Sequence, residues 1–191
     1  GGAEGDLLNG GLGDDIYQDV DAGDSIGEGV DQGTDEVTTA LNTFTLDNLS
    51  RANIENLTFT GFGLFTGTGN DRNNIITAGD DGSVINLSDG DDTGEGGGGD
   101  DIINAGSGSD TLRGRNGEDI LNGGIGNDFL FGGNNDDILQ GGENDDELTG
   151  GGGADTLDGG DGIDWALYRS AQAAVEPSVD FSVGSIILAS C

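Results

Sequence analysis

The stretch GGIGNDFLFGGNNDDILQ (residues 123–140) contains two copies of one nine-residue pattern. Each copy opens with glycines, has an aspartate at its sixth place and an apolar residue at its eighth. The same frame, set from Gly96 to Leu167, gives eight consecutive nonapeptides without an insertion. Place six is aspartate in all of them, and place eight is Ile or Leu until the last copy, which has Ala166. A fixed period of this kind indicates a repeat architecture.

The aspartates at place six are the candidate metal ligands of this chain. Going backward from Gly96, the frame continues to Gly69 but weakens, with Ser83 and Asn74 at place six as poor or absent metal sites. A separate pair of repeats stands at the front of the chain, out of phase with the main array. The candidates in the array are Asp92, Asp101, Asp110, Asp119, Asp128, Asp137, Asp146, Asp155 and Asp164, and those in the front pair are Asp6 and Asp15.

The nonapeptide fits a turn of six residues followed by a three-residue strand whose middle side chain, at place eight, points inward. A helix is excluded because each of its glycines would cost about 1 kcal/mol. Glycines at places one, two and four permit positive φ angles and a crowded backbone. The turn therefore brings main-chain oxygens and the place-six carboxylate together, and these hard oxygen ligands are the ones that calcium prefers.

The charge balance supports a cation as part of the fold. The chain has 38 acidic residues against five arginines, a net charge of -33, and only 32% apolar residues, which is typical of disorder. However, the acids recur at fixed intervals, and like charges held in register need a counter-ion. The acidity excludes nucleic acid as a partner and disfavours anionic membranes. The chain has no histidine, and its one cysteine, Cys191, rules out an internal disulfide.

The pattern GGxGxDxUx resembles the RTX (repeat-in-toxin, hemolysin-type) family of calcium-binding nonapeptide repeats. The resemblance implies an all-β fold, a right-handed parallel β-roll in which two nonapeptides form one coil. Calcium would lie between turns two repeats apart, pairing Asp92 with Asp110, Asp101 with Asp119, and so on to Asp146 with Asp164. Turn-glycine carbonyls would complete the sites, and the array would hold about seven Ca²⁺ ions. The glycines assigned to this role are Gly99, Gly108, Gly117 and Gly126.

Several positions depart from the pattern. Asn135 and Asn144 replace glycines at place four, and asparagine tolerates the left-handed region, so we expect both turns to survive. Arg115 replaces a glycine at place two and puts its own turn in doubt. Gly94 at place eight is expected to leave a gap in the aliphatic ladder.

We divide the chain into a short out-of-phase repeat pair (1–18), a β-rich spacer that continues the solenoid (19–68), the nonapeptide roll (69–167) and a cap or tail (168–191). The alternating segments 43–46 and 57–65 are expected to be strands. The asparagines at 70, 73 and 74 are expected to stack as a ladder. Because the chain begins within a repeat, we expect it to be a fragment of a longer protein.

Two alternative sites receive little weight. Residues 89–100 nearly spell an EF-hand loop, but no flanking helix is plausible there. Adjacent acids such as Asp100 and Asp101 would point to opposite faces of an extended chain, so we predict no catalytic site.

Three functions remain open. The first is a calcium-binding structural module of a secreted or cell-surface bacterial protein, which folds outside the cell and associates with other domains or with itself. The second is the repeat tail of a secreted enzyme (a protease, lipase or epimerase). The third is a segment of an adhesin or surface layer.

Overall fold

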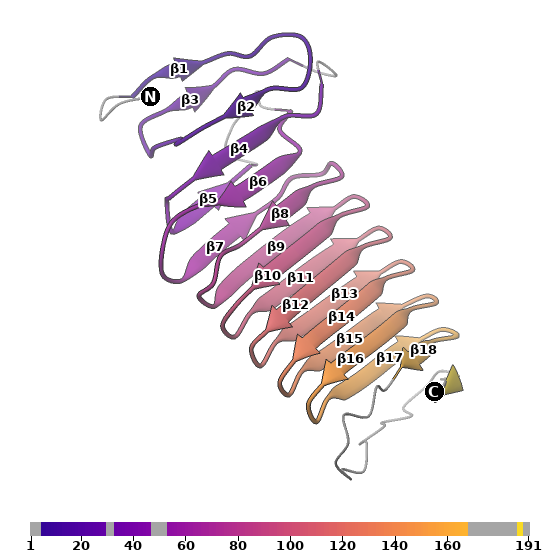
Figure 1. Cartoon of the computed structure of the whole chain (residues 1–191). Helices are drawn as coiled ribbons and strands as arrows, with labels where there is room; N and C mark the ends of the chain where they lie inside the picture. The colour runs from indigo at the N-terminus through magenta and orange to yellow at the C-terminus, as the bar shows by residue number, and fades with distance from the viewer. Residues whose placement is uncertain (1–4, 30–32, 47–52, 168–186, 189–191) are drawn as a thin grey trace.

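The computed structural model describes residues 5–29, 33–46, 53–167 and 187–188, and all regular secondary structure in these ranges is β. The strands stack into one elongated parallel solenoid, with the two ends of the chain at opposite ends of the stack (Figure 1). None of the described segments forms a helix that is long and apolar enough to span a lipid bilayer. This architecture confirms the predicted all-β parallel roll.

Alternate strands belong to opposite faces of the stack. In the described residues one sheet runs in the order β19 (Ile187–Leu188), β18 (Trp165–Leu167), β16 (Glu147–Gly152), β14 (Phe129–Asn134), β12 (Thr111–Asn116), β10 (Thr93–Gly97), β8 (Ile75–Thr77), β6 (Asn56–Phe59), β4 (Glu36–Thr39) and β2 (Ile16–Tyr17). The opposing sheet runs β17 (Thr156–Asp161), β15 (Ile138–Glu143), β13 (Ile120–Ile125), β11 (Ile102–Ser107), β9 (Ser83–Asp89), β7 (Phe65–Thr68) and β5 (Thr43–Thr45). A short pair of β1 (Leu7–Leu8) and β3 (Ser25–Ile26) lies at the front.

Strand register in the array follows two nonapeptides per coil. Leu112 pairs with Leu130, and Leu130 pairs with Leu148, at an offset of 18 residues. Since consecutive strands alternate between the two sheets, place-eight side chains from both sheets point into one interior. They are all buried there: Ile103, Leu112, Leu121, Leu130, Leu139, Leu148, Leu157 and Ala166. The predicted aliphatic ladder is therefore confirmed.

The gap expected at Gly94 does not exist. A Cβ built on Gly94 would lie 2.9 Å from Cγ2 of Ile103 and 3.2 Å from Cδ1 of Leu87. Leu87 stands at place one of its own repeat and is fully buried, so its side chain fills the space that Gly94 leaves. The sequence frame assigned inward positions only to place eight, and it therefore missed this compensation.

Glycines serve two different purposes in the turns. Places two and four have positive φ, including the non-glycine residues Arg115 (84°), Asn135 (80°) and Asn144 (83°). The two asparagine turns are retained as predicted, and Arg115 keeps its turn as well. Place-one glycines do not have positive φ, and the reason for glycine there is close approach. A Cβ on Gly123 would lie 2.3 Å from Oδ2 of Asp128.

The turns provide a direct stability test at Gly126. Its φ is 137°, and an added Cβ would lie 1.8 Å from the carbonyl oxygen of Gly108 in the coil below. We expect Gly126→Ala to destabilise the folded chain by well over about 1 kcal/mol, since alanine fits neither the angle nor the space. Asn135→Gly is the matched control at the same place of the next repeat, and it should leave the unfolding midpoint unchanged. Thermal unfolding in excess calcium measures both, and equal midpoints for the two variants would contradict the assignment.

The spacer continues the stack with longer coils. Ile16 pairs with Glu36 and Glu36 with Asn56, an offset of 20 residues. The segment 43–46 forms β5 as expected, but 57–65 is not one strand, because residues 60–64 separate the end of β6 from the start of β7. The rings of Phe59 and Phe65 stack with centroids 4.6 Å apart.

The asparagine ladder expected at residues 70, 73 and 74 is wrong. Asn70 and Asn74 bond to each other inside one turn, because Asn74 Nδ2 donates to Asn70 Oδ1 at 3.2 Å. A real ladder lies elsewhere, at place nine. There Asn122 Nδ2 donates to Asn104 Oδ1 at 2.7 Å, and Asn104 Nδ2 donates to Asn86 Oδ1 at 3.0 Å.

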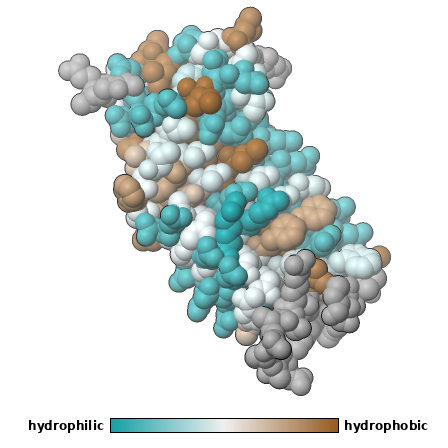
Figure 2. Space-filling view, in the orientation of Figure 1, coloured by the Kyte–Doolittle hydropathy of each residue, from teal (hydrophilic) through white to brown (hydrophobic). Residues whose placement is uncertain are grey.

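The predicted C-terminal cap (168–191) lies outside the described residues except for β19, which pairs with β18 and extends the first sheet. The EF-hand alternative at residues 89–100 is wrong, since these residues form the end of β9, a turn and β10. The molecular face seen in Figure 2 is mostly hydrophilic, with scattered hydrophobic patches.

Candidate metal-binding edges

The place-six aspartates of the array lie at the turn that precedes each strand, with their side chains turned into the roll. Eight of the nine are buried, with at most 2% of their surface exposed, and Asp155 is half-buried. They form two columns, one along each edge of the stack. The first acid column is Asp92, Asp110, Asp128, Asp146 and Asp164, and the second is Asp101, Asp119, Asp137 and Asp155.

Within a column, each carboxylate except that of Asp101 accepts a backbone N–H from the turn of the previous coil. Oδ1 of Asp110 accepts a hydrogen bond from the backbone N–H of Asp92 at 2.7 Å, and Oδ1 of Asp128 accepts one from Asp110 at 2.8 Å. The pattern repeats to Asp164 in the first column. In the second column it runs from Asp101 to Asp155. The structure therefore brings together the aspartates that are 18 residues apart, and it separates Asp128 from Asp137.

The other carboxylate oxygen of these residues has no protein partner. Within the described part of the chain, no hydrogen bond reaches the buried Oδ2 of Asp92, Asp101, Asp110, Asp119, Asp128, Asp137, Asp146 or Asp164. A buried polar atom without a partner costs roughly 1–3 kcal/mol, and more when it is charged. A row of such atoms is the arrangement expected where a bound cation supplies the missing partner.

Main-chain oxygens converge on the same places. A Cβ added at Gly123 would lie 2.3 Å from Asp128 Oδ2 and 2.6 Å from the carbonyl oxygen of Gly141. Gly132 has the same two neighbours one repeat later, Asp137 Oδ2 at 2.3 Å and the carbonyl of Gly150 at 2.7 Å. A carboxylate oxygen and a carbonyl oxygen thus share a small space that only glycine leaves open. This donor set suits calcium.

The sequence assigned the carbonyl ligands to place four. A Cβ added to Gly117 would lie 2.0 Å from the carbonyl oxygen of Gly99, and one added to Gly126 would lie 1.8 Å from that of Gly108, so these carbonyls face the turn of the next coil. The carbonyls of place-one glycines such as Gly141 and Gly150 also lie close to the carboxylates, while the place-four assignment stays a prediction. The place-one carbonyls were missed because the repeat frame does not show which carbonyl faces inward.

Burial dominates the protonation of these carboxyl groups. It raises the pKa of Asp92, Asp101, Asp137 and Asp146 to about 7 and that of Asp110 to about 6, and neighbouring aspartates add to the effect. The pKa values of Asp119, Asp128, Asp155 and Asp164 are raised for the same first reason. Burial therefore opposes the ionised form of these carboxyl groups.

Place-five side chains have a role that sequence reasoning missed. Asp91 Oδ1 accepts the N–H of Ser109 at 2.9 Å, and Asp100 Oδ1 accepts that of Glu118 at 2.9 Å. These exposed acids cap the turn of the next coil. Adjacent acids at places five and six therefore have different environments, with one at the surface and the other inside.

The first acid column continues into the spacer with altered residues. The N–H of Asp15 donates to Asp35 Oδ1 at 2.9 Å, and the N–H of Asp35 donates to Glu55 Oε2 at 3.0 Å. Of the predicted front residues, Asp15 therefore joins this column. Asp6 donates its N–H to Asp24 Oδ1 at 3.0 Å on another turn. Asp35 and Glu55 were missed because the spacer coils do not keep the nine-residue period.

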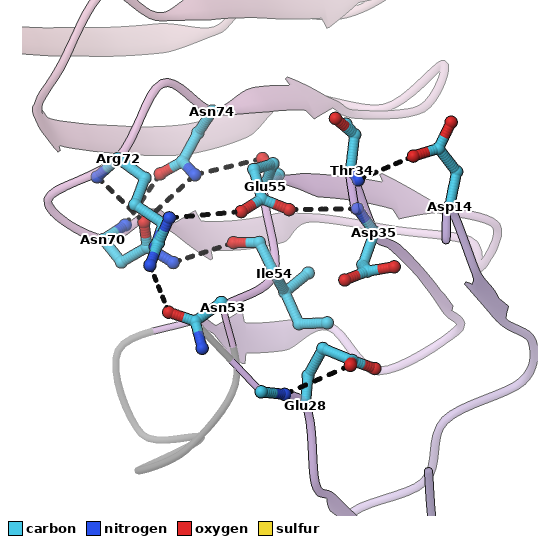
Figure 3. A network of polar contacts seen from close by, with 11 residues as sticks. Asp14, Glu28, Thr34, Asp35, Asn53, Ile54, Glu55, Asn70, Arg72 and Asn74 are labelled. Carbon is cyan, nitrogen blue, oxygen red and sulfur yellow. Dashed lines mark hydrogen bonds and ion pairs between the residues drawn. The ribbon is translucent and has the colours of Figure 1, made fainter. Parts of the chain in front are cut away.

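An arginine occupies the column between the spacer and the array (Figure 3). Arg72 Nη1 lies 3.7 Å from Glu55 Oε1, and its Nη2 also bonds to Asn53. The amide of Asn74, at place six, is used by the protein: its Oδ1 accepts the N–H of Asn70 at 2.7 Å and its Nδ2 donates to the carbonyl of Glu55 at 3.0 Å. At this coil the guanidinium supplies the positive charge.

This arrangement predicts a cost for removing Arg72. Burial raises the pKa of Glu55 and Arg72 lowers it, so Arg72→Met leaves a largely buried carboxylate without its cation. We expect a loss of about 1–2 kcal/mol, between the values for exposed and buried pairs. Arg113→Met is the control, since Arg113 is more exposed and its Nη1 lies 3.6 Å from Glu95 Oε1. Chemical denaturation in excess calcium compares the two, and a larger loss at Arg113 would contradict the role of Arg72.

Comparison with known families agrees with this geometry. A family model described as RTX calcium-binding nonapeptide repeat (4 copies) matches residues 68–103, 95–130 and 131–166. These matches span the array and both acid columns in it. No curated protein matches the chain.

Proposed function

Because the chain belongs to the RTX calcium-binding nonapeptide repeat family, we propose that its array folds when the acid columns bind calcium, as a structural module of a secreted or cell-surface bacterial protein. The observation that carries the proposal is the row of buried Oδ2 atoms without a protein partner. The place-six aspartates from Asp92 to Asp164 would be the charged ligands. Bound calcium would neutralise them and bridge successive coils.

Folding and binding are expected to be one event. In the array the interior between the sheets is narrow and filled mainly by the aliphatic place-eight side chains, while the whole chain has a net charge of -33. Burying so many carboxylates without a cation opposes folding, and a site that exists only in the folded state converts binding energy into folding energy. Seven pairs of aspartates face each other along the columns, so we propose about seven ions.

The mechanism suits export. At low intracellular calcium the acidic repeats repel one another and stay unfolded, a form that can pass a narrow channel. Outside the cell, calcium at the roughly millimolar level that suits weak extracellular modules would drive folding. The front residues Asp6 and Asp15 would add ligands beyond the array.

The test is circular dichroism of the purified chain at neutral pH, first with chelator and then with calcium. We expect the β signal to appear only with calcium, and a calorimetric titration to give about seven ions. A β signal that persists unchanged in chelator would exclude calcium-driven folding. Sedimentation in the same samples tests the surface-layer alternative, since ordered calcium-dependent polymers would replace the structural-module proposal by an assembly function.

A further inference from the structure

Three carboxylates meet outside the nonapeptide array, near the front of the stack. Asp15, Glu28 and Asp35 each offer an oxygen atom, and these atoms all lie within 4.8 Å of one another. We propose that they form a separate calcium site, in which Glu28 is a ligand of a kind that the array does not use. The proposal rests on the proposed calcium-dependent fold and adds to it at Asp15, while Glu28 and Asp35 lie outside the array sites.

Burial and hydrogen bonding indicate a missing ligand at this cluster. Asp35 is only 1% exposed, and its Oδ2 has no hydrogen-bond partner within the described part of the chain. Oδ2 of Asp15 is also buried and has no hydrogen-bond partner among the described residues. The other oxygen of Asp35 is occupied by the N–H of Asp15 at 2.9 Å. Each aspartate therefore keeps a buried oxygen available, and both residues belong to the same cluster of three acids.

Glu28 is held in place by donors. The Tyr17 hydroxyl donates to Glu28 Oε2, and the N–H of Gly29 donates to Oε1 at 3.1 Å. The N–H of Gly10 donates in turn to the Tyr17 oxygen at 2.8 Å, which leaves the phenol proton directed at Glu28. Both donors fix the position of the Glu28 carboxyl group, and each of its oxygens retains a lone pair for a metal ion. Figure 3 shows the Asp35 carboxylate directed toward the side on which Glu28 lies.

The repeat frame explains how Glu28 reaches this position. Asp24 and Ile26 stand at places six and eight of a repeat, so Glu28 falls at place one of the next turn. In the array, place one lies beside Oδ2 of the place-six aspartate in the same repeat. The front repeat has the same arrangement, since a Cβ on Gly10 would lie 2.2 Å from Asp15 Oδ2. A glutamate at place one therefore puts a third carboxylate beside a pair of aspartates.

The chemistry favours calcium over other metals. Three hard, charged oxygens suit Ca²⁺, and its flexible coordination of six to eight oxygens can be completed by main-chain carbonyls and water. Zinc usually requires histidine or cysteine, and neither type is present in the cluster. The competing arrangement is a set of carboxyls that share protons and bind no ion.

Terbium luminescence tests the site, because Tb³⁺ substitutes for Ca²⁺ and emits when a nearby tyrosine or tryptophan is excited. The chain has two tyrosines and one tryptophan, so Trp165→Phe with Tyr168→Phe leaves Tyr17 as the single antenna. Trp165 is half exposed at the opposite end of the stack, so its replacement does not touch the front cluster. We expect saturable emission in this background, and its displacement by calcium.

Glu28→Gln and Asp35→Asn should each weaken terbium binding by at least about tenfold, since each removes a charged ligand. Asp21→Asn is the matched control, an exposed acid on the same segment, and should leave the emission unchanged. Absence of emission in the background, or equal emission from the Glu28 variant and the control, would overturn the site and favour shared protons. Circular dichroism of the same samples reports array folding separately, so failure of the calcium-driven fold and failure of this site are distinguishable.

Discussion

The calcium-free chain should gain β structure when the pH falls from about 7.5 to about 5, because protonation replaces the cation in the acid columns. Burial raises the pKa of Asp92, Asp101, Asp137 and Asp146 to about 7, whereas an unfolded aspartate keeps a pKa of about 4. Between these values the folded chain binds more protons than the unfolded chain. Its stability is therefore highest at the acid end and is lost as pH rises through 7.

The measurement is far-ultraviolet circular dichroism in chelator across this range. The titration should stop at about pH 5, above the sequence pI of about 4.1, where the chain would lose its net charge and precipitate. The calcium-loaded chain provides the control and should respond in the opposite direction, since protons compete with calcium for the same oxygens and apparent affinity falls as the pH drops. A signal in chelator that stays flat between pH 5 and 8 would contradict the buried environment of the columns.

The sequence predicts the array well because its period encodes the register. Placing Asp128 and Leu130 in the frame is enough to place their neighbours 18 residues away, and the structure has those pairs. The frame says little about compensation between places. Leu87 fills the space at Gly94, and the place-one carbonyls lie beside the carboxylates. These two features depend on the directions of side chains and carbonyl groups, which the repeat pattern does not contain.

The spacer shows the other limit. The coils that pair β2 with β4 and β4 with β6 have offsets of 20 residues, so Asp35 and Glu55 do not fall on the nine-residue period. In a chain with 38 acidic residues, the sequence does not distinguish the acids of the spacer from ordinary surface charges. Only the stacking of one coil on the next shows that Asp35 continues the column begun by Asp15, and that Arg72 supplies charge at a coil where Asn74 stands at place six.

Position within a column should determine how many calcium sites a single substitution removes. Asp128 lies between Asp110 and Asp146, with its N–H donated to one neighbour and its Oδ1 accepting from the other, so it belongs to two bridges. Asp164 ends the described column and belongs to one, with Asp146. We expect Asp128→Asn to lower the number of bound ions by about two and Asp164→Asn by about one, since each bridge shares its aspartates.

Calorimetric titration with calcium measures the loss, and Asp161→Asn is the matched control, because it removes the same charge from an exposed position at place three. The second acid column provides an internal check. Asp119 and Asp137 bond to each other along the opposite edge and share no carboxylate with Asp128, so their bridge should survive the substitution. Sites that are lost equally on both edges would mean that the array binds calcium as one unit. Equal losses for Asp128→Asn and Asp161→Asn would mean instead that total charge, rather than the columns, governs binding.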